Sequence, residues 1–286
     1  MTIDIEAARQ FSHANGRLID RHRLATTLDG APVEPLLTAL RAYRNADGGF
    51  GHALEPDVRC PGSQPAATLQ ALEVLLDADA SDDPMMADAA DWVSAIAEPD
   101  GGVTTVLASA AGHPRAPWMD PSEGSGFLTY ALAGKLWQAG SGKQWLDRAT
   151  QWCWNQLEGD EEASAYTVKF AIDFLDAVPD PPRAAAALDR LRPAFDPDGC
   201  VVVVGGTENE KITPLEFSPR PGLPSRTLFT EQQIEADLDR VEAGQREDGG
   251  WTVEILQWCP AQALEWRGLA TIWALGVLRA NRRLSS

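Results

Sequence analysis

A short turn sequence, Asp-Gly-Gly followed by an apolar residue, occurs three times in the chain and constrains its fold more than any other feature. The copies are at residues 47–50, 100–103 and 248–251, and each follows a segment with helical periodicity. The glycine pair provides the positive φ that a sharp reversal needs, and the Asp can accept hydrogen bonds from local backbone amides. After each turn come a polar loop and a helix with a Thr near its start: Thr68, Thr129 and Thr271. Such a repeated unit predicts stacked or ring-closed hairpins, because one hairpin cannot bury both of its faces.

Helical periodicity dominates the whole chain, and the predicted fold class is all-α. The candidate helices are about 4–28 with a break near Asn15-Gly16, 32–43, 64–79, 84–97, 125–139, 143–157, 163–178, 181–193, 230–245 and 263–281. Only residues 200–204, CVVVV, have the pattern of a strand.

Four long connections, rich in Gly, Pro and acidic residues, separate some of these helices. They cover about 44–63, 98–124, 194–229 and 246–262. Connections of this length inside a compact helical domain are uncommon unless they are functional. If the helices alternate in direction, the long connections mostly follow helices of one sense. We therefore expect them to gather at one end of the molecule.

Composition limits the classes of partner and the cellular location. The 286 residues are 44% hydrophobic and include ten Trp, enough for one large domain over 1–281 with a short tail at 282–286. A formal charge of −18 argues against nucleic acid or an anionic membrane surface as partner. No basic segment followed by an apolar one marks a signal peptide, and the longest apolar stretches fall short of the roughly 18 residues of a membrane span. The predicted location is cytoplasmic, and the oligomeric state is left open.

Two motifs resemble a known superfamily. The sequence QREDGGW at 245–251 is similar to the Q-x-x-x-G-x-W element of terpenoid cyclases. Gly-Gly-Phe followed by a loop and an ALEVL-type helix resembles the repeat shared by squalene–hopene cyclases and protein prenyltransferase β subunits, the prenyltransferase and squalene oxidase repeat. The resemblance covers about 30–140 and 230–281, and it implies a single-domain α/α toroid with a central cavity. In that superfamily the Gln and Trp of the element are structural, so we expect the same of Gln245 and Trp251.

The chain also departs from the superfamily's catalytic motifs. It has no D-x-D-D acid motif; the nearest string, at 77–80, has Ala in its third acidic slot. The string at 82–86 fails the D-D-x-x-D pattern that holds magnesium in class I enzymes. Asp57 and Cys60 are close in sequence, but no His stands in the late position that the prenyltransferase zinc set requires. We therefore predict no metal and no cofactor.

Four loop segments combine acids, Arg and aromatic residues beyond what turns require. They are 55–59, 113–120, 216–226 and 258–267. For any single segment, helix capping and rim ion pairs are a sufficient explanation. If all four lie at one end of a barrel, they line a concave mouth, which is the expected place for a ligand.

The resemblance suggests carbocation chemistry, which assigns roles to these residues. A proton-donating carboxyl group must stay protonated, which burial or a neighbouring carboxyl group favours, and Glu55 and Asp57 are the closely spaced loop pair. Indole faces can stabilise positive charge, and Arg can hold a diphosphate or carboxylate group without metal. The catalytic candidates are Asp57, Glu55, Asp120 and Glu265. The substrate-binding candidates are Arg59, Arg115, Trp118, Arg220, Arg226, Trp258 and Trp266.

Three functions remain open from the sequence. The first is a terpenoid-cyclase-like enzyme, an isomerase or lyase, that acts on an isoprenoid or polyene in the cavity by acid initiation without metal. The second is a non-catalytic toroid that binds a small hydrophobic ligand, a lipid or a peptide. The third is a carbohydrate-active α/α barrel, in which two carboxylates stand about 5–9.5 Å apart.

Overall fold

The computed structural model describes residues 3–159 and 163–284. These residues form two compact units. Unit 1 combines the described residues up to Leu36 with those from Leu188 onward, and unit 2 comprises those from Leu37 to Ala187. The boundaries fall inside two helices, α3 (Glu34–Arg41) and α9 (Pro181–Leu191). The predicted single domain ending at residue 281 stays a prediction, and residues 285–286 of the predicted tail lie outside the described residues.

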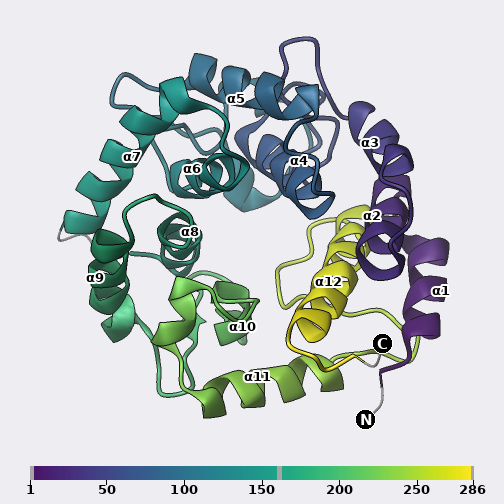
Figure 1. Ribbon diagram of the computed structural model, residues 1–286. Coiled ribbons are helices and arrows are strands. Elements are labelled where there is room, and N and C mark those ends of the chain that lie inside the picture. The colour runs from purple at the N-terminus through teal and green to yellow at the C-terminus, as the bar shows by residue number, and fades with distance from the viewer. Residues whose placement is uncertain (1–2, 160–162, 285–286) are drawn as a thin grey trace. The chain divides into compact units, whose positions relative to one another are not determined.

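Unit 2 is built from helices in two layers. Its helices are α4 (Pro65–Asp77), α5 (Pro84–Ile96), α6 (Leu128–Ala139), α7 (Lys143–Glu158) and α8 (Ala165–Leu175). The helices α4, α6 and α8 pack side by side in that order, and α5 and α7 cover α4 and α6 (Figure 1). Because α4 and α6 are enclosed by neighbours, most of their residues are buried, including the first turn of each helix.

Unit 1 joins the first helices of the chain to the last. Its helices are α1 (Ile5–Asn15), α2 (Leu18–Asp29), α10 (Pro214–Phe217), α11 (Glu231–Ala243) and α12 (Pro260–Ala280). The long helix α12 contacts α1, α2 and α11, and α10 packs on α11. A two-stranded antiparallel sheet pairs β1 (Val201–Val202) with β2 (Lys211–Ile212).

The predicted helices are all present, and their ends differ from the prediction by about three residues or fewer. Several starts are fixed by side chains that accept a hydrogen bond from a backbone amide of the first turn, as the caps Asp4, Asp83, Ser164 and Thr230 do. The predicted strand at 200–204 is shorter than expected, because a turn begins after Val203. Sequence periodicity missed its partner β2 and the four-residue α10.

The Asp-Gly-Gly turns have one geometry in all three copies. In each, an Asp Oδ1 accepts the N–H of the second glycine, at 3.0, 2.9 and 3.2 Å. The first glycine has a φ of +91°, +93° or +89°, which L-residues with a side chain rarely adopt. The predicted reversal by a glycine pair and an Asp cap is confirmed.

A buried threonine hydroxyl connects each turn to the following helix. The amide of the apolar residue after the glycines donates to it: Phe50 to Thr68 at 3.1 Å, Val103 to Thr129 at 2.8 Å and Trp251 to Thr271 at 3.1 Å. These threonines are at most 1% exposed. A buried amide needs an acceptor, so the hydroxyl fixes where the turn meets the helix.

An aromatic ring from a neighbouring helix packs against the second glycine of each turn. The rings belong to Trp92 of α5, Trp152 of α7 and Phe11 of α1. A Cβ on the second glycine would lie 2.6, 3.0 or 2.8 Å from the ring atoms. The third copy is therefore completed by α1, which comes from the other end of the chain.

Gln245 and Trp251 confirm the structural role that the resemblance implies. The Gln245 side-chain amide donates to the carbonyls of Asp4 and Gly249 and accepts from the amide of Asp4. The Trp251 indole N–H donates to the carbonyl of Val241 at 2.7 Å, and the ring is buried. Both side chains bind backbone groups of the turn and of its neighbouring helices.

A fourth turn of this kind was missed by the sequence analysis. Asp196 donates its amide to the carbonyl of Cys200 at 2.9 Å, and Gly199 has a φ of +80°. The same backbone hydrogen bond links Asn45 to Gly49 in the first copy. Cys200 occupies the place of the second glycine, which hid the repeat from a search for Asp-Gly-Gly.

We predict that Thr129→Val lowers the free energy of unfolding by about 1–3 kcal/mol, because the buried amide of Val103 loses its acceptor. Urea denaturation measures this. Thr252→Val is the control, since the Thr252 hydroxyl is exposed and accepts from Arg246 at 3.2 Å, and its effect should be below about 0.5 kcal/mol. Equal losses in the two variants would contradict the role given to the threonine hydroxyl.

We also predict that Gly249→Ala is far more destabilising than Gly30→Ala. Both glycines have positive φ, but a Cβ at Gly249 would lie 2.2 Å from the carbonyl oxygen of Ala7, whereas nothing lies within 4 Å of a Cβ at Gly30. Positive φ alone costs about 1–2 kcal/mol, and the clash raises the loss at Gly249 to about 3 kcal/mol or more. Thermal unfolding of the two variants decides the matter; similar melting temperatures would show that α1 does not pack on this turn.

Candidate functional site

Two of the four predicted loop segments lie side by side in unit 2. Val58 and Arg115 form an isolated antiparallel bridge. The amide of Arg59 donates to the carbonyl of Pro114 at 2.9 Å, and the amide of Ala116 donates to the carbonyl of Asp57 at 2.8 Å. The segment at 55–59 is thereby fixed against the segment at 113–120.

Gln64, directly ahead of α4, ties the same two loops together. Its amide Nε2 donates to the Ser109 hydroxyl at 2.7 Å, and its Oε1 accepts the amide of Leu107 at 3.0 Å. Cys60 Sγ donates to the carbonyl of Ser109 at 3.2 Å. Gln64 is buried, and the sequence analysis did not single it out. A lone amide next to Pro65, the first residue of a helix, carried no distinctive signal.

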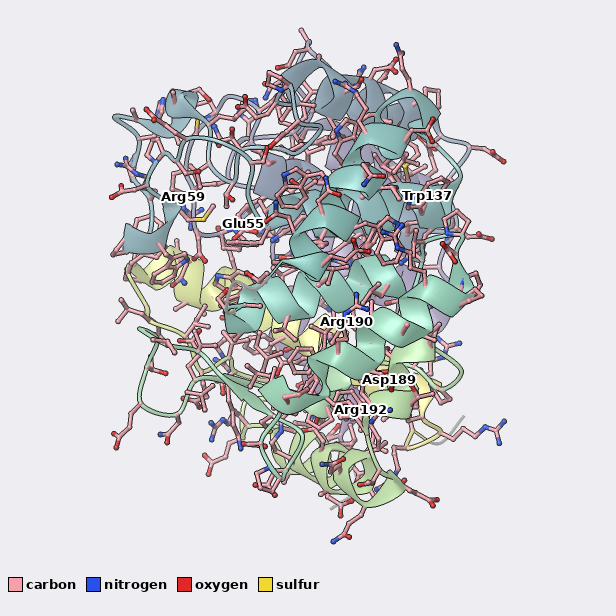
Figure 2. The ribbon with its side chains drawn as sticks, turned by 90° about the vertical axis from the view of Figure 1, so that its left-hand side faces the viewer. Glu55, Arg59, Trp137, Asp189, Arg190 and Arg192 are labelled. Atoms are coloured by element: carbon pink, nitrogen blue, oxygen red, sulfur yellow. The ribbon has the colours of Figure 1, made fainter. Side chains whose placement is uncertain are left out.

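The centre of this region is a pair of buried acids, Glu55 and Asp57. Their exposed fractions are 7% and 5%. Glu55 Oε2 accepts from the Gln70 side-chain amide at 2.5 Å, and its Oε1 accepts from the Asp57 backbone amide at 3.3 Å. Asp57 Oδ2 accepts from the Trp118 indole N–H at 3.1 Å. Glu55 and Arg59 are on the same loop, ahead of α4 (Figure 2).

Gln70 was not predicted as a site residue, although a signal was present. It lies on the second turn of α4, among apolar residues, and is 8% exposed. A lone amide in an apolar helix needs a partner, because burying it without hydrogen bonds costs free energy. That partner is the Glu55 carboxylate, so α4 positions one of the two acids.

Three predicted residues in the second loop have unequal environments. Trp118 is 45% exposed, yet its indole N–H is used by Asp57. Arg115 forms an ion pair with Asp120 at 2.6 Å and donates to the carbonyl of His113 at 3.1 Å. The Asp120 side chain is 71% exposed. Asp120 therefore lacks the burial that a proton-donating acid requires, and the interaction of Arg115 with it holds the loop.

The fourth predicted segment begins just before α12. Trp258, Glu265 and Trp266 are half-buried near the N-terminal end of this helix. Arg267 donates to Asp248 at 2.7 Å and to the carbonyl of Trp251 at 3.2 Å, and its guanidinium carbon lies 4.5 Å from the centre of the Phe11 ring. Arg267 is thus part of the third Asp-Gly-Gly turn.

The third predicted segment is at the opposite end of α12, which corrects the expectation that all four segments gather at one end. Asn281, directly after α12, accepts from Arg226 at 2.8 Å and donates to the carbonyl of Pro219 at 2.9 Å. Arg220 is exposed beside it. A helix of 21 residues is about 30 Å long, so Arg220 and Arg226 are remote from Trp258 and Glu265. The cause is that residues 214–228 pack on α11 and on the end of α12.

A second charged group in unit 2 was not predicted. Lys135 of α6 lies 3.6 Å from Glu73 of α4. Burial lowers the pKa of Lys135, but the nearby Asp173 and Glu73 outweigh it and the pKa is raised. Burial raises the pKa of the Asp173 carboxyl group, although Lys135 and Lys169 oppose this. These side chains connect α4, α6 and α8 by charge as well as by packing.

None of the helices in the described parts of the chain has the length and hydropathy for crossing a bilayer. Across the same residues, no three His, Cys, Asp or Glu side chains converge as metal ligands would.

Comparisons with known proteins give the fold. No family model matches the sequence, and no curated protein matches it. A protein from Actinoplanes of solved structure aligns with 97% of this chain and 99% of its own, at a TM-score of 0.59 and 17% identity. The type II terpene cyclase MstE from Scytonema, in its apo form, aligns with 93% of this chain and 89% of its own, at a TM-score of 0.54 and 13% identity. A variant of MstE in complex with its substrate, geranylgeranyl dihydroxybenzoate, aligns with 92% of this chain and 87% of its own, at a TM-score of 0.54 and 13% identity.

At these identities the likeness establishes the fold alone. The chain has a terpene-cyclase-like helical fold, and the prediction of an all-α fold of the α/α toroid class is confirmed at that level. The narrower likeness to squalene–hopene cyclases and prenyltransferase β subunits stays a prediction.

We predict that the contribution of Asp248 to stability depends on pH. The hydrogen bond from Arg267 lowers the pKa of Asp248 below its usual 3.8, so the ionised form is favoured in the folded state. The resulting stabilisation is fully present above about pH 4 and is lost as the pH falls through the folded-state pKa. Asp248→Asn keeps an oxygen acceptor for the Gly250 amide but removes the charge. Urea unfolding at pH 7, 5 and 3 should therefore show a wild-type advantage that shrinks at pH 3.

Asp82→Asn is the matched control, because Asp82 is an exposed acid in a loop. Its effect on the free energy of unfolding should stay below about 0.5 kcal/mol at all three pH values. A wild-type advantage over Asp248→Asn that is constant from pH 7 to pH 3 would show that the Arg267 contact does not lower this pKa.

Proposed function

We propose that the protein is a terpene-cyclase-like enzyme that acts on an isoprenoid or polyene substrate by acid initiation, without a metal-dependent step. The observation that carries the proposal is the buried pair Glu55 and Asp57, held by Gln70 and Trp118. The fold likeness supports the substrate class, since the type II terpene cyclase MstE was determined with geranylgeranyl dihydroxybenzoate. The enzyme class, isomerase or lyase, and the cytoplasmic location belong to the same proposal.

The reaction requires a proton donor next to an alkene or epoxide. A carboxyl group keeps its proton when it is buried and when a second carboxyl group is close, because both conditions disfavour the charged form. Glu55 and Asp57 are both buried and are two residues apart, and the Glu55 carboxylate lies 3.3 Å from the Asp57 backbone amide. Hydrogen bonds from the Gln70 amide and the Trp118 indole orient the two groups, and neither donor is an acid that would compete for the proton.

The chemistry is an addition of a proton followed by the loss of one. The acid gives its proton to one alkene carbon, and the electron pair of the double bond forms the new C–H bond. The positive charge on the other carbon is then attacked by a second double bond, which closes a ring. A final proton loss restores neutrality, so the product is an isomer of the substrate. The face of the exposed Trp118 ring is available to stabilise the positive charge.

Incubation with linear polyprenes, their epoxides, prenyl diphosphates and geranylgeranyl-substituted dihydroxybenzoate, with magnesium or with EDTA, tests the proposal. We expect an isomeric product in EDTA, detected by mass spectrometry, and one added deuterium when the reaction runs in D₂O. Turnover only with magnesium would replace acid initiation by diphosphate ionisation. Binding without turnover would favour the non-catalytic ligand-binding alternative.

Substitutions of the two buried acids test which of them donates the proton. Glu55→Gln and Asp57→Asn should each reduce kcat by about 100-fold or more, because general acid catalysis contributes about that much. Asp120→Asn is the matched control, an acid of the adjoining loop that is exposed and paired with Arg115, and its kcat should stay within about threefold. Normal turnover by both acid variants, with unchanged melting temperature, would show that this pair is not the proton donor.

A further inference from the structure

A pocket in unit 1 lies between α11 and the C-terminal end of α12. Its volume is about 580 Å³. Ile234 and Leu238 of α11 form an apolar wall, and Arg220, Asn281 and Arg282 contribute polar groups. This size and mixture are typical of small-molecule sites. The pocket is at the opposite end of α12 from Trp258 and Glu265, and it belongs to no site described above.

Three acids near this pocket share one arginine, Arg283. Arg283 binds Glu235 at 2.5 Å, Glu242 at 2.8 Å and Asp239 at 3.1 Å. These hydrogen bonds raise the pKa of the Arg283 guanidinium group. Glu235, the acid in the pocket lining, is therefore paired with Arg283, and this ion pair weakens its attraction for a cation in the pocket.

Two arginines of the lining have no such partner. Arg220 and Arg282 are both exposed, and within residues 3–159 and 163–284 neither side chain has a hydrogen-bond or ion-pair partner. Arg220 and Arg282 bring two positive charges to the pocket lining, against one negative charge from Glu235. A planar guanidinium binds phosphate and carboxylate oxygens with two hydrogen bonds.

Arg226 adds a positive charge behind the pocket. Its Nη2 donates to Asn281 Oδ1 at 2.8 Å, and Asn281 lines the pocket. Arg226 Nε and Nη1 are buried and have no hydrogen-bond partner in the described part of the chain. Burial lowers the pKa of Arg226, as expected for a cation that lacks a counter-charge. An anion in the pocket would supply the missing negative charge.

The C-terminal end of α12 does not by itself explain why several arginines lie near it. Cations near a helix C-terminus are stabilised by its exposed carbonyl groups. Arg279, on the last turn of α12, instead donates to the carbonyls of Thr27 and Leu28 in α2. Among the residues that the structure describes, the side chains of Arg220 and Arg282 contact no carbonyl of the helix end. Of the Arg226 guanidinium nitrogens, Nη2 donates to the Asn281 side chain, while Nε and Nη1 have no partner among these residues.

We propose that this pocket binds a small oxyanion, the phosphate or carboxylate group of a metabolite. Arg220 and Arg282 contact the anion, and Arg226 supports it by charge through Asn281. The site is independent of the proposed reaction at Glu55 and Asp57, so either proposal can fail without the other.

Isothermal titration of the full chain at low salt tests this, with inorganic phosphate, pyrophosphate and succinate as separate probes. We expect saturable binding with one site per chain, and binding that weakens as salt is added. The double variant Arg220→Gln with Arg282→Gln should weaken binding by about tenfold or more, because both direct contacts are lost. Tighter binding of succinate than of both phosphates would assign the site to carboxylates, and the reverse order would assign it to phosphates.

Two substitutions test whether Arg226 contributes to anion binding through its positive charge. Arg226→Lys should keep the affinity within about threefold, whereas Arg226→Gln should weaken it by about fivefold or more. Arg190→Gln is the control, an exposed arginine of α9 that removes the same charge away from the pocket, and it should bind as wild type does. The double variant at exposed positions keeps the test valid if Arg226→Gln does not fold. Absence of saturable binding for all three probes, or equal binding by the double variant and Arg190→Gln, overturns the proposal.

Discussion

The hydrogen bond from the residue after each Asp-Gly-Gly turn to a buried threonine hydroxyl is the contact on which the rest of the structure depends. It occurs at Thr68 and Thr129 in unit 2 and at Thr271 in unit 1. Each bond fixes the end of one hairpin against the start of the next helix, and an aromatic ring closes the turn from the neighbouring helix. Because the amide is buried, breaking this bond leaves a polar group without a partner. The same turn therefore sets the position of helices in both units.

This constraint explains why the intervening loops can carry chemistry. The loops that follow Phe50 and Val103 are pinned at both ends, so the residues between are free to serve other purposes than folding. In the first loop these residues include Glu55 and Asp57, and in the second they include Trp118. The backbone bridge between Val58 and Arg115 then brings the loops together, and α4 adds Gln70. A buried acid pair results from two repeats of the same turn.

The sequence predicts the parts of this arrangement that have a local signal. Helical period and the glycine pairs predicted the helices and the turns, because each depends on neighbouring residues. The proximity of segments 55–59 and 113–120 was also expected. The predicted position of Arg220 and Arg226 was wrong. Their position depends on how residues 214–228 pack on α11 and α12, and no local sequence pattern encodes that packing. The contact of Gln64 with Ser109 was missed for the same reason, because the two residues are 45 positions apart, whereas Gln70 had a local signal as a lone amide in an apolar helix.

The packing of α1 on the third turn has a consequence for how the chain acquires its structure. The ring of Phe11 and the backbone at Ala7 are the neighbours of Gly249 and Gly250, and Asp4 bonds to Gln245 across a separation of 241 residues. The helix α1 can pack on α2 early, but its contacts with this turn form only after residues 245–251 have been synthesised. Unit 2, whose contacts lie between positions 37 and 187, can consolidate in that interval. The third turn therefore depends on a contact between residues that are far apart in the chain, whereas the contacts of unit 2 do not.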